Sequence, residues 1–321
     1  HPLDFSRIEK KCGYIHEKLK DLESAKDCYQ EHLKIVTDLY EEHPDVQYYQ
    51  EMVVGEHNMG MIERRLKNIE ESNAHLNAEK KIRMALFHED DCDAHRYALG
   101  IVHRHLGENY ESLKQYLEAL REYRVFYYHM AVLSEQPRYR QAYYVALEKL
   151  GNVHKHFNDP HHLIQAIDCY EKVYHFVEKM HNDRSLVTIL QKLAFTYLKA
   201  GHLEEAMQLY EKQEKLLEGL ITSDERYLED YASCLNYKGM ILKKNDPEKA
   251  RELFEKVIAL RQDEASTPYH FFRLGNTYRL LGEVTQNKDY YLAAIHCFEN
   301  SQLKSSEPYR KACLEALKGL E

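Results

Sequence analysis

Cysteine and histidine are the side chains of this sequence that could act as nucleophiles or metal ligands. The chain contains seven cysteines and twenty histidines. An odd cysteine count without a CxxC pair favours free thiols in a reducing, cytoplasmic environment. Three cysteines directly precede an aromatic residue at a repeated position: Cys28, Cys169 and Cys297. Because a catalytic nucleophile would be unique rather than periodic, we interpret them as small, buried packing residues.

Two histidine clusters contain the side-chain types that bind transition metals. The first spans residues 88–95, and the second comprises His154, His156, His161 and His162. Zinc sites usually show tighter Cys/His spacing, and aspartate in the first cluster also suits a helix N-cap. The sequence contains no nucleotide-binding glycine loop, HExxH pair or nucleophile elbow. We therefore predict no metal site, no cofactor and no catalytic residue.

The composition narrows the classes of protein to which the chain can belong. Hydrophobic residues make up 44% of its 321 residues, which is enough for a sizeable core, whereas glycine (12) and proline (7) are scarce. Scarcity of turn residues argues against an all-β fold. The formal net charge of -9 disfavours nucleic acid as a partner. No apolar run approaches the ~20 residues that a membrane span requires, so we expect a protein without membrane association.

A small residue recurs inside successive amphipathic helical patterns. Glycine within a helix costs about 0.5–1 kcal/mol relative to alanine, so its repetition indicates close approach of a partner helix. The recurring residues are Gly13, Gly60, Gly100, Gly151, Ala194, Gly239 and Gly275.

A second signal follows each small residue in the next helical pattern. Alanine or serine is followed four residues later by an aromatic residue or leucine, which places both on one helix face. We expect the small member to allow close helix packing and the large member to fill the gap between hairpins. The pairs are Ala25/Tyr29, Ser72/Leu76, Ser112/Tyr116, Ala166/Tyr170, Ala206/Tyr210, Ala250/Phe254 and Ala294/Phe298.

Proline and glycine mark the expected ends of these helices. All seven prolines stand where a helix could begin, and three follow an N-cap residue: Asp159-Pro160, Asp246-Pro247 and Thr267-Pro268. We place Gly107, Gly201 and Gly282 in the turns between the two helices of a hairpin.

These signals resemble the tetratricopeptide repeat, most closely in LAFTYLKAGHLEEAMQLYEK (193–212). The small residues lie 47, 40, 51, 43, 45 and 36 residues apart, compared with about 34 in that family, which implies longer helices. The resemblance implies an all-α, right-handed α-solenoid of about seven hairpins and a C-terminal capping helix, forming one domain over residues 1–321. The expected repeats are 4–42, 44–88, 92–134, 137–181, 183–221, 223–263 and 267–304, with the capping helix at 307–320.

The resemblance also implies that the first helix of each hairpin lines a concave groove. Four residues after the small residue, five of seven hairpins carry a cation: Arg64, Arg104, Lys155, Lys243 and Arg279. These side chains could bind carboxylates, or they could simply complement the helix dipole near a C-terminus. Asn152 and Asn276 fall where peptide-binding members of the family hold a ligand's backbone, although either could also be an ordinary surface asparagine.

Three binding hypotheses follow from this sequence. The leading one is a cytoplasmic module that takes an extended, acidic or carboxylate-bearing segment of a peptide or protein in its groove. The second is a peptide-pheromone receptor or a ligand-sensing domain of a larger signalling protein. Its basis is a resemblance to long-period repeats of pheromone receptors and signalling ATPases, the latter in residues 43–60. The third is an oligomeric scaffold, such as a homodimer. Neighbouring domains in the gene and light scattering would discriminate among them.

Overall fold

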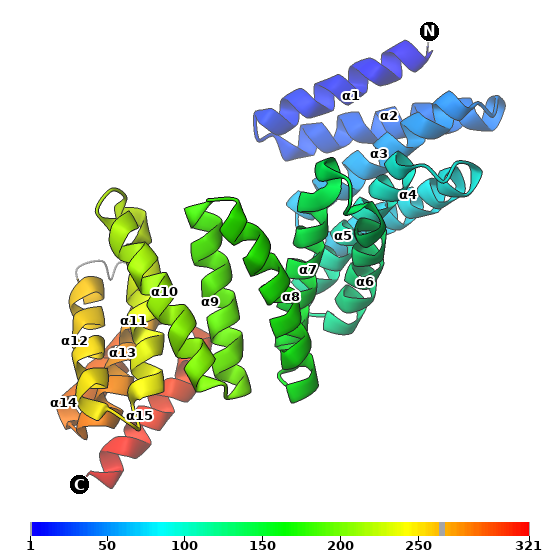
Figure 1. Cartoon of the computed structure of the whole chain (residues 1–321). Coiled ribbons are helices and arrows are strands. Elements are labelled where there is room, and N and C mark those ends of the chain that lie inside the picture. Colours follow the sequence, from blue (N-terminus) through cyan, green and yellow to red (C-terminus); the bar gives the residue numbers. More distant parts are fainter. Residues whose placement is uncertain (1, 263–266, 321) are drawn as a thin grey trace. The chain divides into compact units, whose positions relative to one another are not determined.

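The computed structural model describes residues 2–262 and 267–320, which form helices and turns without a strand (Figure 1). Residues 1, 263 and 321, which end the expected domain and the expected sixth repeat, lie outside the described residues. The chain divides into two compact units, residues 1–157 and 158–321. The boundary falls within the expected fourth repeat, 137–181, so the single domain over the whole chain stays a prediction.

The first unit consists of three antiparallel helical hairpins and one further helix. Each helix contacts the helices that precede and follow it in the unit. The first helices of the hairpins are α1, α3 and α5, and α7 follows the third hairpin. The helices are α1 (Pro2–Lys18), α2 (Leu22–Glu42), α3 (Val46–Arg65), α4 (Ile69–Glu89), α5 (Asp93–Ser112), α6 (Tyr116–Leu133) and α7 (Pro137–Phe157).

The second unit is built by the same stacking of neighbouring helices. It begins with α8, continues through three hairpins and ends with the expected terminal helix, α15, which packs on α14. Its helices are α8 (Pro160–Lys179), α9 (Asp183–Ala200), α10 (Leu203–Ile221), α11 (Leu228–Leu242), α12 (Pro247–Arg261), α13 (Pro268–Thr285), α14 (Lys288–Ser301) and α15 (Glu307–Gly319). Two short 3-10 helices, Glu225–Tyr227 and Lys304–Ser306, precede α11 and α15. This architecture is an all-α solenoid.

The predicted N-caps form as the sequence indicates. The Asp159 carboxylate accepts a hydrogen bond from the backbone N–H of His162 at 3.1 Å, and the Asp246 carboxylate accepts one from Lys249 at 3.1 Å. Thr267 Oγ1 accepts the equivalent bond at the start of α13. Each cap satisfies a backbone donor that the first helical turn would otherwise leave unpaired.

The recurring glycines allow the two helices of a hairpin to touch. A Cβ atom added at Gly13 would lie 2.6 Å from the Tyr29 ring, and one added at Gly239 would lie 2.6 Å from the Phe254 ring. Both aromatic rings are buried. The predicted packing role of the small residues is therefore confirmed, but the large partner fills space inside its own hairpin as well as beside the next one.

The third hairpin corrects two details of the prediction. The pair Ser112/Tyr116 is wrong, because these residues lie at the end of α5 and the start of α6. Ala119 and Tyr123, seven residues later, are fully buried instead. A Cβ at Gly107 would lie 2.5 Å from the Tyr123 ring. Gly107 thus lies inside α5 as a packing residue, in the role that Gly13 has in the first hairpin.

The turns of four hairpins contain a left-handed residue that is not glycine. Lys20, Lys67, Lys114 and Gln286 have φ values of 63°, 68°, 59° and 53°, and only the α9–α10 turn uses glycine, Gly201, at φ 85°. Gly282, which was also expected in a turn, lies inside α13. In the first three of these turns and at Gly201, paired backbone hydrogen bonds close the preceding helix in a Schellman arrangement.

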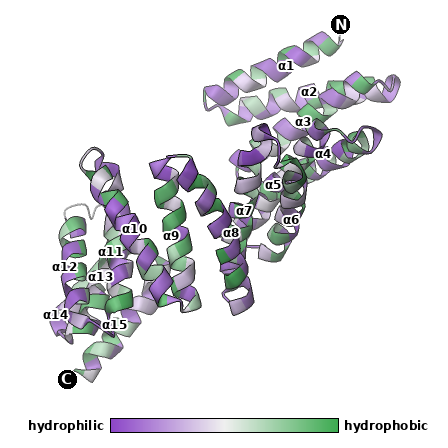
Figure 2. Cartoon of the chain, viewed as in Figure 1, coloured by the Kyte–Doolittle hydropathy of each residue, from purple (hydrophilic) through white to green (hydrophobic). Residues whose placement is uncertain are grey.

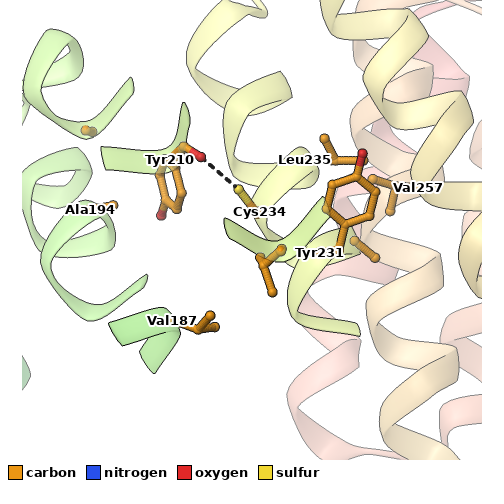
Figure 3. Packing of buried hydrophobic residues seen from close by; sticks show 10 residues of the cluster. Val187, Ala194, Tyr210, Tyr231, Cys234, Leu235 and Val257 are labelled. Carbon is orange, nitrogen blue, oxygen red and sulfur yellow. Dashed lines mark hydrogen bonds between the residues drawn. The ribbon is translucent and has the colours of Figure 1, made fainter. Parts of the chain in front are cut away.

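Hydrophobic and hydrophilic residues are interspersed along each helix, as an amphipathic repeat requires (Figure 2). In the second unit, a cluster of ten buried residues joins α9, α10, α11 and α12 (Figure 3). Within it, the Cys234 thiol donates to the Tyr210 carbonyl oxygen at 3.2 Å, which ties α11 to α10. Among the described residues, no helix combines the length and apolar character needed to cross a bilayer.

Candidate functional site

Helices α3, α5 and α7 of the first unit are joined by ion pairs centred on one glutamate. Glu108, on α5, accepts a hydrogen bond from Arg64 of α3 at 2.6 Å, and its other oxygen lies 2.8 Å from Lys149 of α7. Arg104, one turn before Glu108, approaches the same carboxylate at 4.0 Å. His105 Nδ1 lies 3.5 Å away. We call these five residues the Glu108 centre.

The Glu108 centre carries an excess of positive charge. Three cations, Arg64, Arg104 and Lys149, surround one carboxylate, which leaves a formal excess of two positive charges (three minus one). Burial lowers the pKa of His105, so this imidazole adds no charge at neutral pH. The Nε of Arg104 is buried without a hydrogen-bond partner among the described residues. The excess of charge would favour a further anionic oxygen at the exposed part of the Arg104 side chain, which is 30% exposed.

The ionisation of Glu108 follows from its surroundings. Burial alone would raise its pKa, but the contacts of His105, Lys149 and Arg64 outweigh burial and hold the pKa well below its ordinary value. The carboxylate is consequently charged at every pH at which the protein is handled ordinarily. It acts as a permanent internal counter-ion for the surrounding cations.

The second unit contains a smaller version of the same arrangement. Glu283, on α13, accepts a hydrogen bond from Lys243, which follows α11, at 2.6 Å. It is also paired with Arg279, one turn earlier on α13. Arg279 in turn donates to the Asn276 side-chain oxygen at 2.9 Å. We call these four residues the Glu283 centre.

These contacts change the interpretation of the five predicted cations. The residues were expected at one equivalent position, but Arg64, Lys155 and Lys243 lie at the carboxyl ends of their helices. Arg104 and Arg279 instead lie inside α5 and α13. A cation at the carboxyl end of a helix is also explained by the helix dipole, whereas a cation inside a helix is not. Four of the five, Arg64, Arg104, Lys243 and Arg279, are paired with Glu108 or Glu283, two functional residues that the spacing pattern did not indicate.

The predicted asparagines and Lys155 do not share one environment. Asn152 and Lys155 lie half-buried on α7, in the unit that contains the Glu108 centre. Asn276 is half-buried on α13, and its side-chain oxygen is already bound by Arg279. A ligand could use the remaining amide donor of Asn276 without displacing Arg279.

Both histidine clusters reappear as compact groups, but with different members. Asp90, Cys92 and His95 each bring one ligand-type atom within 4.8 Å of the others. His95 Nδ1 lies 3.1 Å from the Asp90 carbonyl oxygen. The second group is Asp159, His161 and His162, and it omits His154, which is buried, and His156, which stacks on Tyr116. These side chains are of types that bind transition metals, and the absence of a metal site stays a prediction.

The thiols differ in burial between the two units. Cys12, Cys28 and Cys92 in the first unit are half-buried, whereas Cys169, Cys234, Cys297 and Cys313 in the second are buried. Burial raises the pKa of Cys169 and of Cys297 to about 11. The predicted packing role thus fits Cys169 and Cys297 fully, and Cys28 less completely.

Comparison with known proteins identifies the repeat. The tetratricopeptide repeat pattern matches residues 12–35 and 187–216. Among curated proteins, no sequence match is found. The fold is similar to that of a signal transduction ATPase with numerous domains, from Pyrococcus horikoshii, which has a tetratricopeptide repeat sensor. The similarity has a TM-score of 0.65 at 14% identity and covers 99% of this chain and 44% of that chain.

Two further solved structures share the fold. A tetratricopeptide repeat protein from Parabacteroides merdae has a TM-score of 0.56 at 15% identity, covering 99% of both chains. BtubC (BKLC) from P. vanneervenii has a TM-score of 0.52 at 18% identity, covering 78% of this chain and 92% of that chain. With the helical hairpins and their glycine contacts, these similarities show a tetratricopeptide-like helical-repeat fold, and two segments of the chain match the repeat pattern itself.

Proposed function

We propose that this chain is a protein- or peptide-binding module whose first helices bind an extended, acidic or carboxylate-bearing segment. The repeat architecture supports a protein or peptide as the partner. The acidic character of the partner is the finer part of the proposal. It rests on one observation, the excess of cations over carboxylates at the Glu108 centre.

Arg104 is the residue on which ligand affinity should depend most. Its side chain is 30% exposed, and its buried Nε lies 4.0 Å from Glu108, too far for a hydrogen bond. A ligand carboxylate could therefore bind this guanidinium while Arg64 and Lys149 remain paired with Glu108. A charge-assisted hydrogen bond of this kind contributes about 1.5–3 kcal/mol.

The remaining predicted residues have supporting roles in this proposal. Lys155 adds a second cation on α7, and Asn152 could bind a backbone amide of an extended ligand. In the second unit, Lys243, Arg279 and Asn276 could offer a weaker site for a further acidic group. The expected affinity for this second site is lower because Glu283 leaves an excess of only one positive charge (two minus one).

The experiment uses a fluorescent glutamate-rich decapeptide with a free C-terminal carboxylate, and its lysine-rich counterpart. Fluorescence anisotropy should detect binding of the acidic peptide only, and the affinity should fall as salt rises, because exposed charges are screened over about 8–10 Å. The double variant Arg104→Glu/Lys155→Glu should abolish binding while circular dichroism retains its helical spectrum. The control Lys81→Glu/Lys215→Glu makes the same charge change on second helices and should bind normally.

Unchanged affinity of Arg104→Glu/Lys155→Glu for the acidic peptide would show that binding does not use this face. Equal loss in the control would show that only overall charge matters. Either result contradicts the proposal.

A ligand-sensing role in a larger signalling protein is the second candidate. The observation that favours it is the fold shared with the Pyrococcus horikoshii protein, which has a tetratricopeptide repeat sensor and 44% of which is covered by this chain. Sensing would require the same binding event plus an output domain. The full-length gene product decides between the two, because a stand-alone adaptor would lack such a domain.

A further inference from the structure

One exposed face of α6 carries large apolar side chains where a solvated helix should be polar. Leu117, Val125, Tyr128 and Val132 are 57%, 37%, 61% and 52% exposed. Their spacing of eight, three and four residues places them on a single helical face. Contiguous exposed apolar residues of this kind commonly mark an interaction surface.

A hollow of about 390 Å³ adjoins this face and extends it toward α4. Val125 belongs to both the face and the hollow, so the two are continuous. Met84, on the α4 side, is 43% exposed. The wall surface of the hollow is mostly apolar, although half of its residues carry a polar group. The walls are formed by Lys80, Met84, Phe87, His88, Leu99, His103, Val125 and His129.

His129 gives the hollow a polar group without a protein partner. The residue is only 7% exposed, and its Nδ1 has no hydrogen-bond partner among the described residues. Burial, with some contribution from His103 and Arg96, lowers the pKa of His129 to about 4, so the ring is neutral. By contrast, His103 Nδ1 lies 2.5 Å from the Glu122 carboxylate. A buried polar atom left unpaired is uncommon in a native protein.

The exposed charges beside the apolar face are positive. Arg121 and Arg124 lie on the same side of α6 as Val125 and Tyr128, and both are exposed. Neither arginine makes an ion pair within the two described stretches of chain. The neighbouring Glu122 is already paired with His103 and lies 3.6 Å from Lys80. With the half-buried Glu118 beside Leu117, this face keeps a formal excess of one positive charge (two minus one) in a chain whose formal net charge is -9.

We propose that the α6 face and the adjoining hollow bind an amphipathic helix of a partner protein, with acidic residues beside its apolar anchors. Val132 lies fifteen positions after Leu117, or about 22 Å along the helix, which matches about four turns of a bound helix. A helix laid along an apolar groove inserts side chains at spacings of three and four residues. Acidic neighbours would pair with Arg121 and Arg124.

A second copy of this chain fits the surface less well. A symmetric dimer through this face would bring the same patch of both copies together. Arg121 and Arg124 would then face their own counterparts, which is repulsive without an intervening acid. The proposed face also shares no residue with the Glu108 or Glu283 centre, so the two binding activities are separable by mutation.

The test is a display library of 18-residue helical peptides. Leucine is fixed at four positions spaced by three and four residues, and the adjacent positions are randomised among aspartate, lysine and serine. Peptides are selected for binding to the full chain and against binding to the variant Val125→Asp/Tyr128→Asp. We expect enrichment of aspartate next to the leucines.

The enriched peptides are then measured against single-site variants by anisotropy. Affinity should fall at least tenfold in Val125→Asp and about threefold to tenfold in Arg121→Glu/Arg124→Glu. It should not change in Val46→Asp, a matched exposed site on α3, or in Arg104→Glu/Lys155→Glu. Circular dichroism must show that each variant remains helical.

Three outcomes would overturn the proposal. Selection that enriches no peptide, or enriches lysine or serine equally, excludes an acidic helix as the occupant. Enriched peptides whose affinity is unaffected by Val125→Asp bind elsewhere. Sedimentation equilibrium showing a dimer that Tyr128→Asp dissociates would assign the face to self-association instead.

Discussion

The Glu108 and Glu283 centres both pair cations from two helices with one glutamate, but the numbers of charges differ. In each, a cation at the end of one first helix and a cation inside the next first helix share a glutamate: Arg64 and Arg104 at Glu108, Lys243 and Arg279 at Glu283. Glu108 has an additional partner, Lys149, and its side chain is 16% exposed compared with 30% for Glu283. The comparison shows that the same arrangement of side chains can have different interaction energies, because burial and the third cation distinguish the two sites.

The largest expected difference is in folding stability. Glu108→Gln leaves three partly buried cations without their carboxylate and should lower the free energy of unfolding by about 2 kcal/mol. Glu283→Gln should lower it by less than about 1 kcal/mol, because its pairs are more exposed to solvent. Urea denaturation followed by circular dichroism measures both. Equal losses would mean that the two centres are energetically equivalent after all.

The acid dependence of stability isolates the electrostatic part of this difference. Contacts with cations depress the pKa of Glu108 in the folded state, so its contribution is fully present above the unfolded value of about 4.3. That contribution is lost as the pH falls below this value toward the lower folded pKa. The free energy of unfolding should therefore decline less steeply below about pH 4.5 in Glu108→Gln than in wild type. Parallel pH profiles would contradict this assignment.

The thiols of the two units should differ in their reactivity. The half-buried Cys12, Cys28 and Cys92 all lie in the first unit, whereas the second unit contains only buried thiols. Burial also raises the pKa of Cys234 to about 12, which leaves almost no thiolate at neutral pH. A thiol reagent followed by mass spectrometry should modify residues of the first unit at least tenfold faster. Fast, selective modification of Cys169 or Cys297 would contradict a packing role.

Removal of metal ions by a chelator should have the smallest effect on stability. Among the described residues, each unit has one compact group of metal-ligand types, around Cys92 and around His161. A metal bound only by the folded state would stabilise it by mass action, so its removal would lower the melting temperature. We expect the melting temperature to change by less than about 1 °C with EDTA. A larger drop would assign a metal to one group, and Cys92→Ser would then show which.

Much of the fold could be predicted because its signals are local. The N-caps at Asp159, Asp246 and Thr267, and the pairing of Gly13 with Tyr29, depend on spacing within one hairpin. In the third hairpin, the predicted pair Ser112/Tyr116 lies seven residues too early, because Gly100 and Gly107 are seven residues apart on the same helix face and both face α6. Sequence spacing alone does not distinguish between two glycines one heptad apart.

The candidate site was less predictable because its partners are distant in sequence. The cations could be found by counting from the small residues, but Arg64 and Glu108 are 44 positions apart and Lys243 and Glu283 are 40 apart. Which glutamate meets which cation depends on how consecutive hairpins stack. One signal was present in retrospect: a glutamate stands four residues after both Arg104 and Arg279.

The left-handed lysines in the hairpin turns offer a way to make this protein tolerate heat. Lys20, Lys67 and Lys114 adopt a backbone conformation that costs about 1 kcal/mol or more for a residue with a Cβ atom, whereas Gly201 avoids that strain. Replacing the lysines with glycine should relieve more strain than it adds in chain entropy. The three turns do not include residues of the proposed binding surfaces. A thermostable scaffold for crystallisation or peptide display could therefore be built from the turns alone.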